Sequence, residues 1–394
     1  MIAMKKITAL LIALLSSPLA LAGGAGTTAA SFLKIDPAAR TAALSGAAVA
    51  LADDDATLIN HNPAGIGGVE RKQFSFTHNE WVTGIKLESL SYAHPVTEDF
   101  TIGAAVNYLH TDSVGSTDGL GADTGSSFSL NDGVATIGAA NRFGEYFLLG
   151  AAVKGIRQSM DSRSAMAIAG DAGAILKFQY FSLGAAVTNF GSGIKLYEQS
   201  SPLPQTLKGG LTILPVRSLL LSGQADKAVD SNVILRGAVE YSFRGIIVPD
   251  DRYSLRAGYR NGSSENTGPG FSFGAGMRIK ALGIDYSFVP MGDLGAANRI
   301  SISFAFGEKR PDPTDAYSDL FRDMESSDYS RRKPVARVLE EEKESASTAA
   351  DETKAADTKP PQETLRQSDA FSDADKARTR KPRRSSKPAE ISNN

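Results

Sequence analysis

Cysteine is absent from the 394 residues, so the fold must form without disulfides and no lipoprotein-type cysteine stands near the N-terminus. Only four histidines occur, and their positions show no metal-ligand spacing. The sequence contains no His-Glu-x-x-His, no Gly-x-Ser-x-Gly, no phosphate-binding loop and no full Gly-x-Gly-x-x-Gly. These absences predict a protein that is not an enzyme and that binds no cofactor.

Long apolar runs are also missing. After residue 22 no stretch of about 18 apolar residues appears, so no transmembrane helix is predicted. Residues 1–22 combine Lys5 and Lys6, an apolar run over 7–15 and the small-residue ending Ala-Leu-Ala, which is the pattern of a secretory signal peptide. Export without a helical anchor leaves two classes of protein, a soluble envelope protein or an outer-membrane barrel.

Residues 232–306 alternate between apolar and polar with a period of two. Leu235 and Tyr241 fall on one face of this pattern, and Arg236 and Glu240 fall on the other. Because side chains alternate across a strand, such a segment has one apolar and one charged surface. In a soluble sandwich the apolar face would meet a core, whereas in a membrane barrel it would meet lipid and the polar face would meet the lumen.

Periodicity across residues 71–306 predicts about fourteen strands, most of them near the length of a tilted membrane strand, about 9 to 11 residues. Loops rich in Gly, Ser and Asp alternate with short turns. This alternation is typical of an outer-membrane barrel, and an even strand count places both barrel ends on the short-turn, periplasmic side. The predicted strands are 71–81, 84–94, 99–111, 130–142, 146–157, 165–178, 180–190, 204–214, 218–226, 232–243, 252–260, 270–280, 281–289 and 298–306, with long loops at 111–129, 191–204, 261–270 and 289–298.

Charge density divides the chain near Gly307. Residues 308–394 hold 37 charged residues in 87 positions, whereas the first 307 residues hold 49. A segment so charged and so poor in aromatics does not bury enough apolar surface to offset the entropy lost on ordering. A disordered tail is therefore predicted, on the periplasmic side of the membrane.

Two features of the tail carry hypotheses. Tyr317, Leu320, Phe321 and Met324 are spaced as one face of a short helix, which predicts a docking motif for a periplasmic partner or, equally, a few apolar residues in a solvated tail. Residues 376–387 hold seven basic side chains and no acid. A periplasmic location favours an anionic envelope polymer or plain solvation there over nucleic acid.

The segment before the first strand carries a family resemblance. It runs FLKIDPAARTAALSGAAVALADDDATLINHNPAGIGG over residues 32–68, with partly helical spacing and a Gly- and Ala-rich middle. This series resembles the mature N-termini of the PorV/PorQ family of outer-membrane proteins, and its Asp-Asp-Ala to Asn-Pro-Ala progression is similar to the hatch of the FadL group of fatty-acid channels. Both families are fourteen-stranded barrels, so the resemblance implies the fold that periodicity also predicts.

The predicted architecture is an all-β transmembrane antiparallel β-barrel of about 14 strands with a hatch in its lumen. Its parts are a signal peptide at 1–22, a hatch at 23–70, a barrel at 71–307 and a disordered tail at 308–394.

The resemblance implies two functions of different kinds. PorV-like barrels are non-enzymatic components of type IX secretion, which receive cargo with a sorting domain from a translocon and deliver it to a sortase. FadL-like barrels are passive channels that carry hydrophobic small molecules past the hatch. The N-terminal series is closer to PorV/PorQ, so cargo binding ranks first and hydrophobic transport second. Outer-membrane lipid is the partner that both share.

The resemblance places hatch or gating positions at Asp53, Asp54, Asn62, Pro63 and Ala64. Asn62-Pro63 is a turn signal, since proline fixes its own φ and disfavours helix at the preceding residue. From the residues alone, a surface turn opening the first strand is the alternative. The three consecutive carboxylates that begin at Asp53 lack the alternate spacing of a calcium loop, so no metal site is predicted.

Charged residues that share the inward parity of the late strands form the second candidate site. They are expected to cross-link the wall through ion pairs, to hold the hatch or to bind a ligand head group, and structural pairing is favoured because buried charges need partners. A surplus of arginine over carboxylate leaves anion binding open. These residues are Arg236, Glu240, Arg256, Arg260, Arg278, Lys280 and Asp285.

Overall fold

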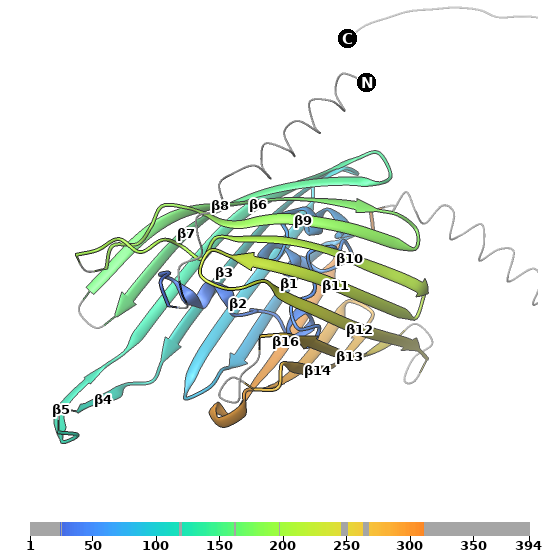
Figure 1. Ribbon diagram of the computed structural model, residues 1–394. Coiled ribbons are helices and arrows are strands. Elements are labelled where there is room, and N and C mark those ends of the chain that lie inside the picture. Colours follow the sequence, from blue (N-terminus) through green and yellow to red (C-terminus); the bar gives the residue numbers. More distant parts are fainter. Residues whose placement is uncertain are drawn as a thin grey trace, which may run out of the picture. The chain divides into compact units, whose positions relative to one another are not determined.

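The chain forms a closed antiparallel β-barrel of fourteen strands, seen here in a computed structural model (Figure 1). The final strand, β16, closes the ring on β1, with Lys72 opposite Phe306 and Glu80 opposite Asn298. The predicted fold class is therefore confirmed. The structure describes residues 24, 26–117, 120–160, 163–196, 198–245, 251–262 and 268–310.

The barrel strands are 9 to 15 residues long, and two further strands form a separate hairpin. In chain order the barrel strands are β1 (Lys72–Glu80), β2 (Ile85–Pro95), β3 (Phe100–Thr111), β6 (Leu130–Phe143), β7 (Phe147–Met160), β8 (Arg163–Lys177), β9 (Phe181–Gly191), β10 (Thr206–Val216), β11 (Leu219–Ala228), β12 (Ile234–Arg244), β13 (Arg252–Arg260), β14 (Phe271–Ile279), β15 (Leu282–Pro290) and β16 (Ala296–Phe306), and the hairpin is β4 (Val114–Thr117) with β5 (Asp123–Phe128).

All fourteen predicted strands occur, with their ends shifted by up to a few residues. The hairpin β4–β5 lies within the predicted loop 111–129 and extends away from the barrel strands (Figure 1). It escaped prediction because its Gly-, Ser- and Thr-rich strands carry no apolar alternation. The predicted loop 289–298 shortens to 291–295, which includes η4 (Gly292–Leu294). We name the end with this hairpin the long-loop end and the other the short-turn end.

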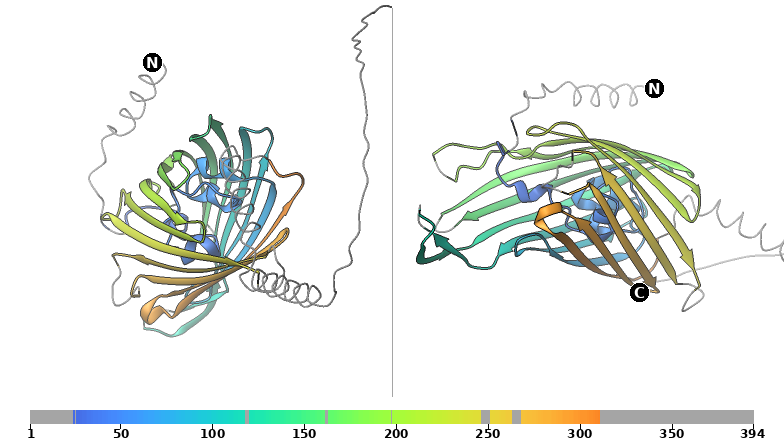
Figure 2. Two further views of the ribbon diagram at one scale, coloured as in Figure 1. Left: turned by 90° about the vertical axis from the view of Figure 1, so that its right-hand side faces the viewer. Right: turned by 60° about the horizontal axis from the view of Figure 1, so that its bottom comes forward.

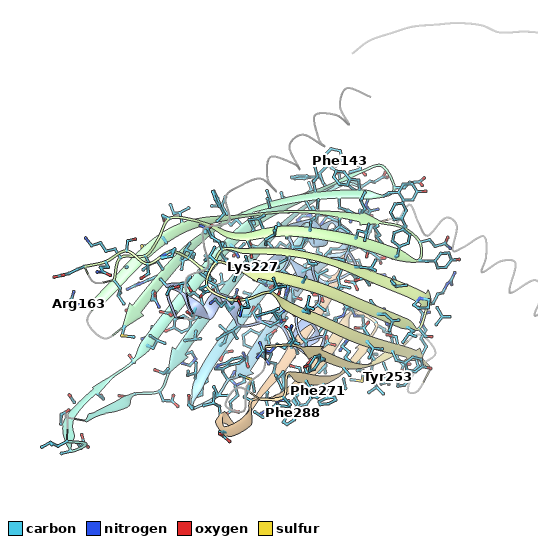
Figure 3. All side chains as sticks on the ribbon, viewed as in Figure 1. Phe143, Arg163, Lys227, Tyr253, Phe271 and Phe288 are labelled. Carbon is cyan, nitrogen blue, oxygen red and sulfur yellow. The ribbon has the colours of Figure 1, made fainter. Side chains whose placement is uncertain are left out.

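The barrel wall is apolar outside and polar inside. On β12, Leu235 and Tyr241 are 55 % and 49 % exposed, whereas Glu240 between them is 1 % exposed. Phe143, Phe271 and Phe288, labelled in Figure 3, are among the large apolar side chains on the outer surface. In water such a surface would be unfavourable, and an outer-membrane barrel turns it to lipid. The sequence alternation thus belongs to a barrel rather than to a soluble sandwich.

The N-terminal segment lies inside the ring of strands (Figure 2). Its short helices are η1 (Ser31–Lys34), α2 (Ala39–Ala43), η2 (Ala56–Asn60) and η3 (Pro63–Gly68). The segment starts at the long-loop end, where the Ala29 amide donates to the carbonyl of Pro202, and reaches β1 at the short-turn end. We call residues 26–69 the hatch.

Small wall residues make room for the hatch backbone. Gly173 of β8 and Gly184 of β9 both face inward, and a Cβ atom on them would overlap Asn62 Oδ1 and the Val49 carbonyl oxygen, respectively. Any larger side chain at these two positions would have to displace the hatch. At these two positions, glycine therefore permits a close approach of the hatch backbone to the wall.

The predicted signal peptide and the tail beyond residue 310 lie outside the described residues. Within the described ranges, no helix has both the length and the apolar character to cross a membrane.

Candidate functional site

Hatch and wall are joined by an ionic network with a buried centre, which we call the inner cluster: Arg40, Asp53, Glu240, Arg252, Arg256 and Asp285. Glu240 is its centre. Its carboxylate accepts from Arg40 Nε of the hatch at 3.0 Å and from Arg256 Nε of the wall at 2.6 Å. Arg256 also donates to Asp285 at 2.7 Å. Because each buried charge has a partner, the cluster fastens α2 to strands β12, β13 and β15.

The hatch supplies its own carboxylates to this network. Arg40 donates to Asp53 at 2.7 Å and to Asp55 at 3.3 Å. Burial would raise the pKa of the Asp53 carboxyl, but the adjacent Arg40 guanidinium holds that pKa below its usual value. Asp54 accepts from the Glu70 amide and lies 3.4 Å from Arg278 Nη1 of the wall. Of the three consecutive carboxylates, Asp53 and Asp55 thus pair with Arg40 inside the hatch, whereas Asp54 pairs with Arg278 of the wall.

Asn62, Pro63 and Ala64 form a rigid turn at the hatch centre. Asn62 is the N-cap of η3: its Oδ1 accepts from the Ala64 amide at 3.0 Å, and Pro63 occupies the first helical position. Asn62 Nδ2 donates to the Val49 carbonyl at 2.7 Å and points toward the carbonyls of β8 and β9. The turn is fully buried, so the alternative of a surface turn is wrong.

A second site lies in the long-loop half of the lumen. Hatch and wall there enclose a cavity of about 210 Å³, which we call the outer cavity. Its hatch side is apolar at Phe32, Leu33 and Ile35 and polar at Asp36 and His61. Its wall side carries cations, an amide, a hydroxyl and a carboxylate beside apolar residues. They are contributed by Lys154, Lys208, Arg236, Arg260, Gln224, Thr188 and Asp226 among others. The inner cluster borders a smaller cavity of about 70 Å³.

Charges in the outer cavity are incompletely paired. Arg236 donates to Asp226 at 2.6 Å and to the carbonyl of Ser45 at 2.5 Å. Arg260 lies opposite Arg236 in the β12–β13 register, and Lys208 lies opposite Asp226 in the β10–β11 register. Across the described part of the chain, neither the Arg260 nor the Lys208 side chain has a hydrogen-bond or ion-pair partner.

On the hatch side, Asp36 is held as an anion. Its Oδ1 accepts from the Thr41 hydroxyl at 2.6 Å and lies 3.4 Å from His61 Nε2. Burial alone would raise the pKa of Asp36, but His61, Thr41 and the nearby Arg299 together lower it to about 2. The second carboxylate oxygen of Asp36 is buried without a hydrogen-bond partner, as is the hydroxyl of Thr188.

The predicted lumen charges separate into two groups. Glu240, Arg256, Arg278 and Asp285 lie around the hatch carboxylates, and Arg236 and Arg260 lie in the outer cavity. Lys280 differs from the prediction. It lies in the turn after β14 with a φ of 52°, and its side chain is exposed, because the strand ends one residue earlier.

Sequence reasoning missed three important residues. Arg40 is a lone cation in the Ala-rich part of the hatch, and that isolation was a usable signal. Lys208 and Thr188 share the inward parity of their strands, so a complete parity analysis would have found both.

Within the described ranges no group of three His, Cys, Asp or Glu residues has the geometry to hold a metal ion. The predicted docking motif Tyr317, Leu320, Phe321 and Met324 lies outside the described residues.

These features define a class of protein: a transmembrane β-barrel of outer-membrane construction, with an apolar exterior, a polar lumen and a hatch derived from its own N-terminus.

Comparisons with known proteins agree with this class. Residues 22–165, less than half of the chain, match the model of an uncharacterised protein family (UPF0164). Among solved structures, the chain is similar to a TodX monoaromatic hydrocarbon channel deltaS2 mutant, with 12 % identity, a TM-score of 0.50 and coverage of 68 % of this chain and 99 % of that chain. A search of curated protein sequences found no match.

Two further structures are similar. The Pseudomonas putida toluene transporter TodX has 13 % identity, a TM-score of 0.46 and coverage of 73 % of this chain and 98 % of that chain. A Pseudomonas aeruginosa FadL homologue has 12 % identity, a TM-score of 0.47 and coverage of 68 % and 98 %. At such identities a likeness shows the fold alone. The fold is that of a fourteen-stranded antiparallel barrel similar to the TodX deltaS2 mutant structure, and the PorV/PorQ resemblance stays a prediction.

Proposed function

We propose that this protein is a passive outer-membrane channel, in which small molecules enter the long-loop end of the lumen and pass the hatch without catalysis. The observation that carries the proposal is the pair of cavities on the two sides of the hatch, one of about 210 Å³ and one of about 70 Å³. A plug that merely sealed the lumen would be expected to pack tightly against the wall on all sides.

The hatch contacts the wall through both apolar and polar groups. Ala52 and Ala64 of the hatch pack against Leu148 and Ile175 of the wall. Ion pairs and hydrogen bonds through Arg40, Ser45 and Asn62 add to these contacts. Passage of a solute past the hatch therefore requires some of these contacts to open. A FadL-like channel for hydrophobic molecules is the finer form of the proposal, and the apolar face of η1 at the cavity, with Phe32 and Leu33, supports it.

A disulfide lock tests the channel function. The Ser45 hydroxyl of the hatch lies 2.7 Å from the Ser272 hydroxyl of β14, and the chain has no cysteine of its own. The double variant Ser45→Cys/Ser272→Cys should therefore form a hatch–wall disulfide without side reactions. In liposomes we expect the oxidised variant to block release of entrapped sorbitol and reduction to restore it.

The matched control places a disulfide within the wall. The hydroxyls of Ser242 on β12 and Ser254 on β13 lie 2.9 Å apart, so Ser242→Cys/Ser254→Cys leaves the hatch free. Release through this control should not respond to oxidation. Equal release from oxidised and reduced Ser45→Cys/Ser272→Cys would exclude hatch movement as the route.

Cargo binding in type IX secretion is the second candidate. One observation favours it, the hairpin β4–β5 that projects beyond the barrel strands at the long-loop end (Figure 1). Affinity capture from native membranes tests this candidate. We expect a translocon, a sortase or a sorting-domain protein to accompany the full chain and to be lost when residues 114–128 are deleted. Capture of such a protein with the deletion variant would dismiss the hairpin as its binding site.

A further inference from the structure

The outer cavity contains an arrangement of charges that is unfavourable without a ligand. Arg236 and Arg260 face each other directly in the β12–β13 register, and both line the cavity. Like charges opposite one another destabilise a strand pair. Asp226 pairs with Arg236, and in the described part of the chain no carboxylate pairs with Arg260. The side chain of Lys208, on β10, adds a second cation without a partner.

Uncharged polar side chains also line the cavity. Asn60 lies on its hatch side, and Asn107 and Thr206 lie on its wall side. Amides and hydroxyls both donate and accept hydrogen bonds, so they suit the hydroxyl groups of a ligand.

The size of the cavity limits the ligand. At about 210 Å³ it is smaller than the range of about 300–1,000 Å³ typical of pockets for drug-sized molecules. A long acyl chain would exceed this volume, whereas a compact six-carbon acid such as gluconate would fit. The lining combines apolar side chains, such as Phe32 and Leu87, with cations, amides and hydroxyls, so it offers an anion polar contacts that a plain acyl chain would not use.

We propose that the outer cavity binds a small hydroxylated anion, whose carboxylate or phosphate group pairs with Arg260 and Lys208 and whose hydroxyls contact the uncharged polar side chains of the lining. The inference rests on the proposed function, because it names the solute class that a channel would hold first at its long-loop end. It differs from hydrophobic transport, since recognition comes from the wall cations rather than from the apolar face of η1.

Calorimetric titration of the full chain in detergent at low salt tests the inference. Gluconate is the main probe, sorbitol is its uncharged analogue and hexanoate is its analogue without hydroxyls. We expect gluconate to bind at least about tenfold more tightly than either analogue, since a hydrogen bond to a charged group is worth about 1.5–3 kcal/mol and tenfold corresponds to about 1.4 kcal/mol. Sorbitol or hexanoate binding as tightly as gluconate would overturn the inference.

Variants locate the binding site. Arg260→Gln keeps hydrogen-bond donors but removes the charge, and we expect it to weaken gluconate binding about tenfold or more. Arg157→Gln is the matched control, because Arg157 is exposed on the outward face of β7. Unchanged affinity in Arg260→Gln, with folding verified by heat-modifiable gel migration, would also overturn the proposal. Equal weakening of gluconate binding by Arg157→Gln would likewise overturn the proposal.

Inorganic phosphate separates the two anion sources. Displacement of gluconate by phosphate at similar concentration supports a phosphorylated ligand, and failure to displace it supports a carboxylate; both outcomes support the cavity as an anion site. Liposome release keeps the two proposals distinct. Gluconate binding without any solute release would overturn the channel and leave the site, whereas release without preferential gluconate binding would overturn the site and leave the channel.

Discussion

The inner cluster and the outer cavity face the same lumen and use the same residue types, yet their charges are arranged in opposite ways. In the inner cluster the Glu240 carboxylate, 1 % exposed, is shared by arginines of the hatch and of the wall. In the outer cavity Arg260 faces a second arginine and has no acidic partner in the described part of the chain. Buried charges with partners hold a structure together, whereas those without partners are available to a ligand.

We expect the largest loss of stability from a substitution at Glu240. Glu240→Ala leaves Arg40 and Arg256 buried without their shared partner, and breaking a buried pair in this way costs about 3–5 kcal/mol. Urea unfolding of the purified barrel, followed by gel migration, measures the loss. Glu98→Ala, in the exposed turn after β2, is the control and should be neutral. A neutral Glu240→Ala would mean that the inner cluster does not fasten the hatch.

Displacing the hatch should have the next largest effect. Gly173→Val places side-chain atoms where Asn62 Oδ1 lies, and overpacking of this kind costs about 1–3 kcal/mol. We expect faster release of sorbitol from liposomes and earlier cleavage of the hatch by protease. Gly155→Val is the matched control, because a Cβ atom on Gly155 meets nothing within 4 Å on the outward face of β7. Equal release from the two variants would contradict the tight fit of hatch against β8.

Acid should weaken the hatch through Asp36. The pKa of this carboxyl is about 2 in the folded protein, against an ordinary value of 3.8, so its contribution to stability is complete above about pH 4 and is lost as the pH falls through 2. The shift corresponds to about 2 kcal/mol. Urea unfolding between pH 5 and pH 2 measures it. Asp36→Asn should flatten the dependence in that window, and an unaltered profile in this variant would assign the acid effect elsewhere.

The smallest change in stability should come from a substitution in the outer cavity. Arg260→Ala removes a cation that has a like charge opposite it, so we expect a change in stability within about 0.5 kcal/mol, or a small gain. Arg256→Ala, four residues away on the same strand, should instead cost several-fold more, because it breaks pairs with Glu240 and Asp285. Equal losses in the two variants would remove the distinction between the two sites.

Much of the barrel is predictable because strand periodicity is local. The alternation of Leu235, Arg236 and Tyr241 in the sequence already assigns each side chain to one face, and the structure confirms those faces. Lys280 is the exception. The alternation was extended one residue past the end of β14, so Lys280 was predicted to face inward although it lies in the following turn. The hairpin β4–β5 was missed because short strands of Gly, Ser and Thr lack the apolar signal.

By itself, the sequence determined which residues form strands and which side chains face inward, because a period of two depends only on neighbouring residues. The tertiary structure alone decided which inward charges meet. Arg40 and Glu240 are 200 residues apart in the chain, and Arg236 faces Arg260 only through the β12–β13 register. Closure of the ring and the path of the hatch through it fix those distances, so pairing at the inner cluster and the unpaired cations of the outer cavity follow from the fold.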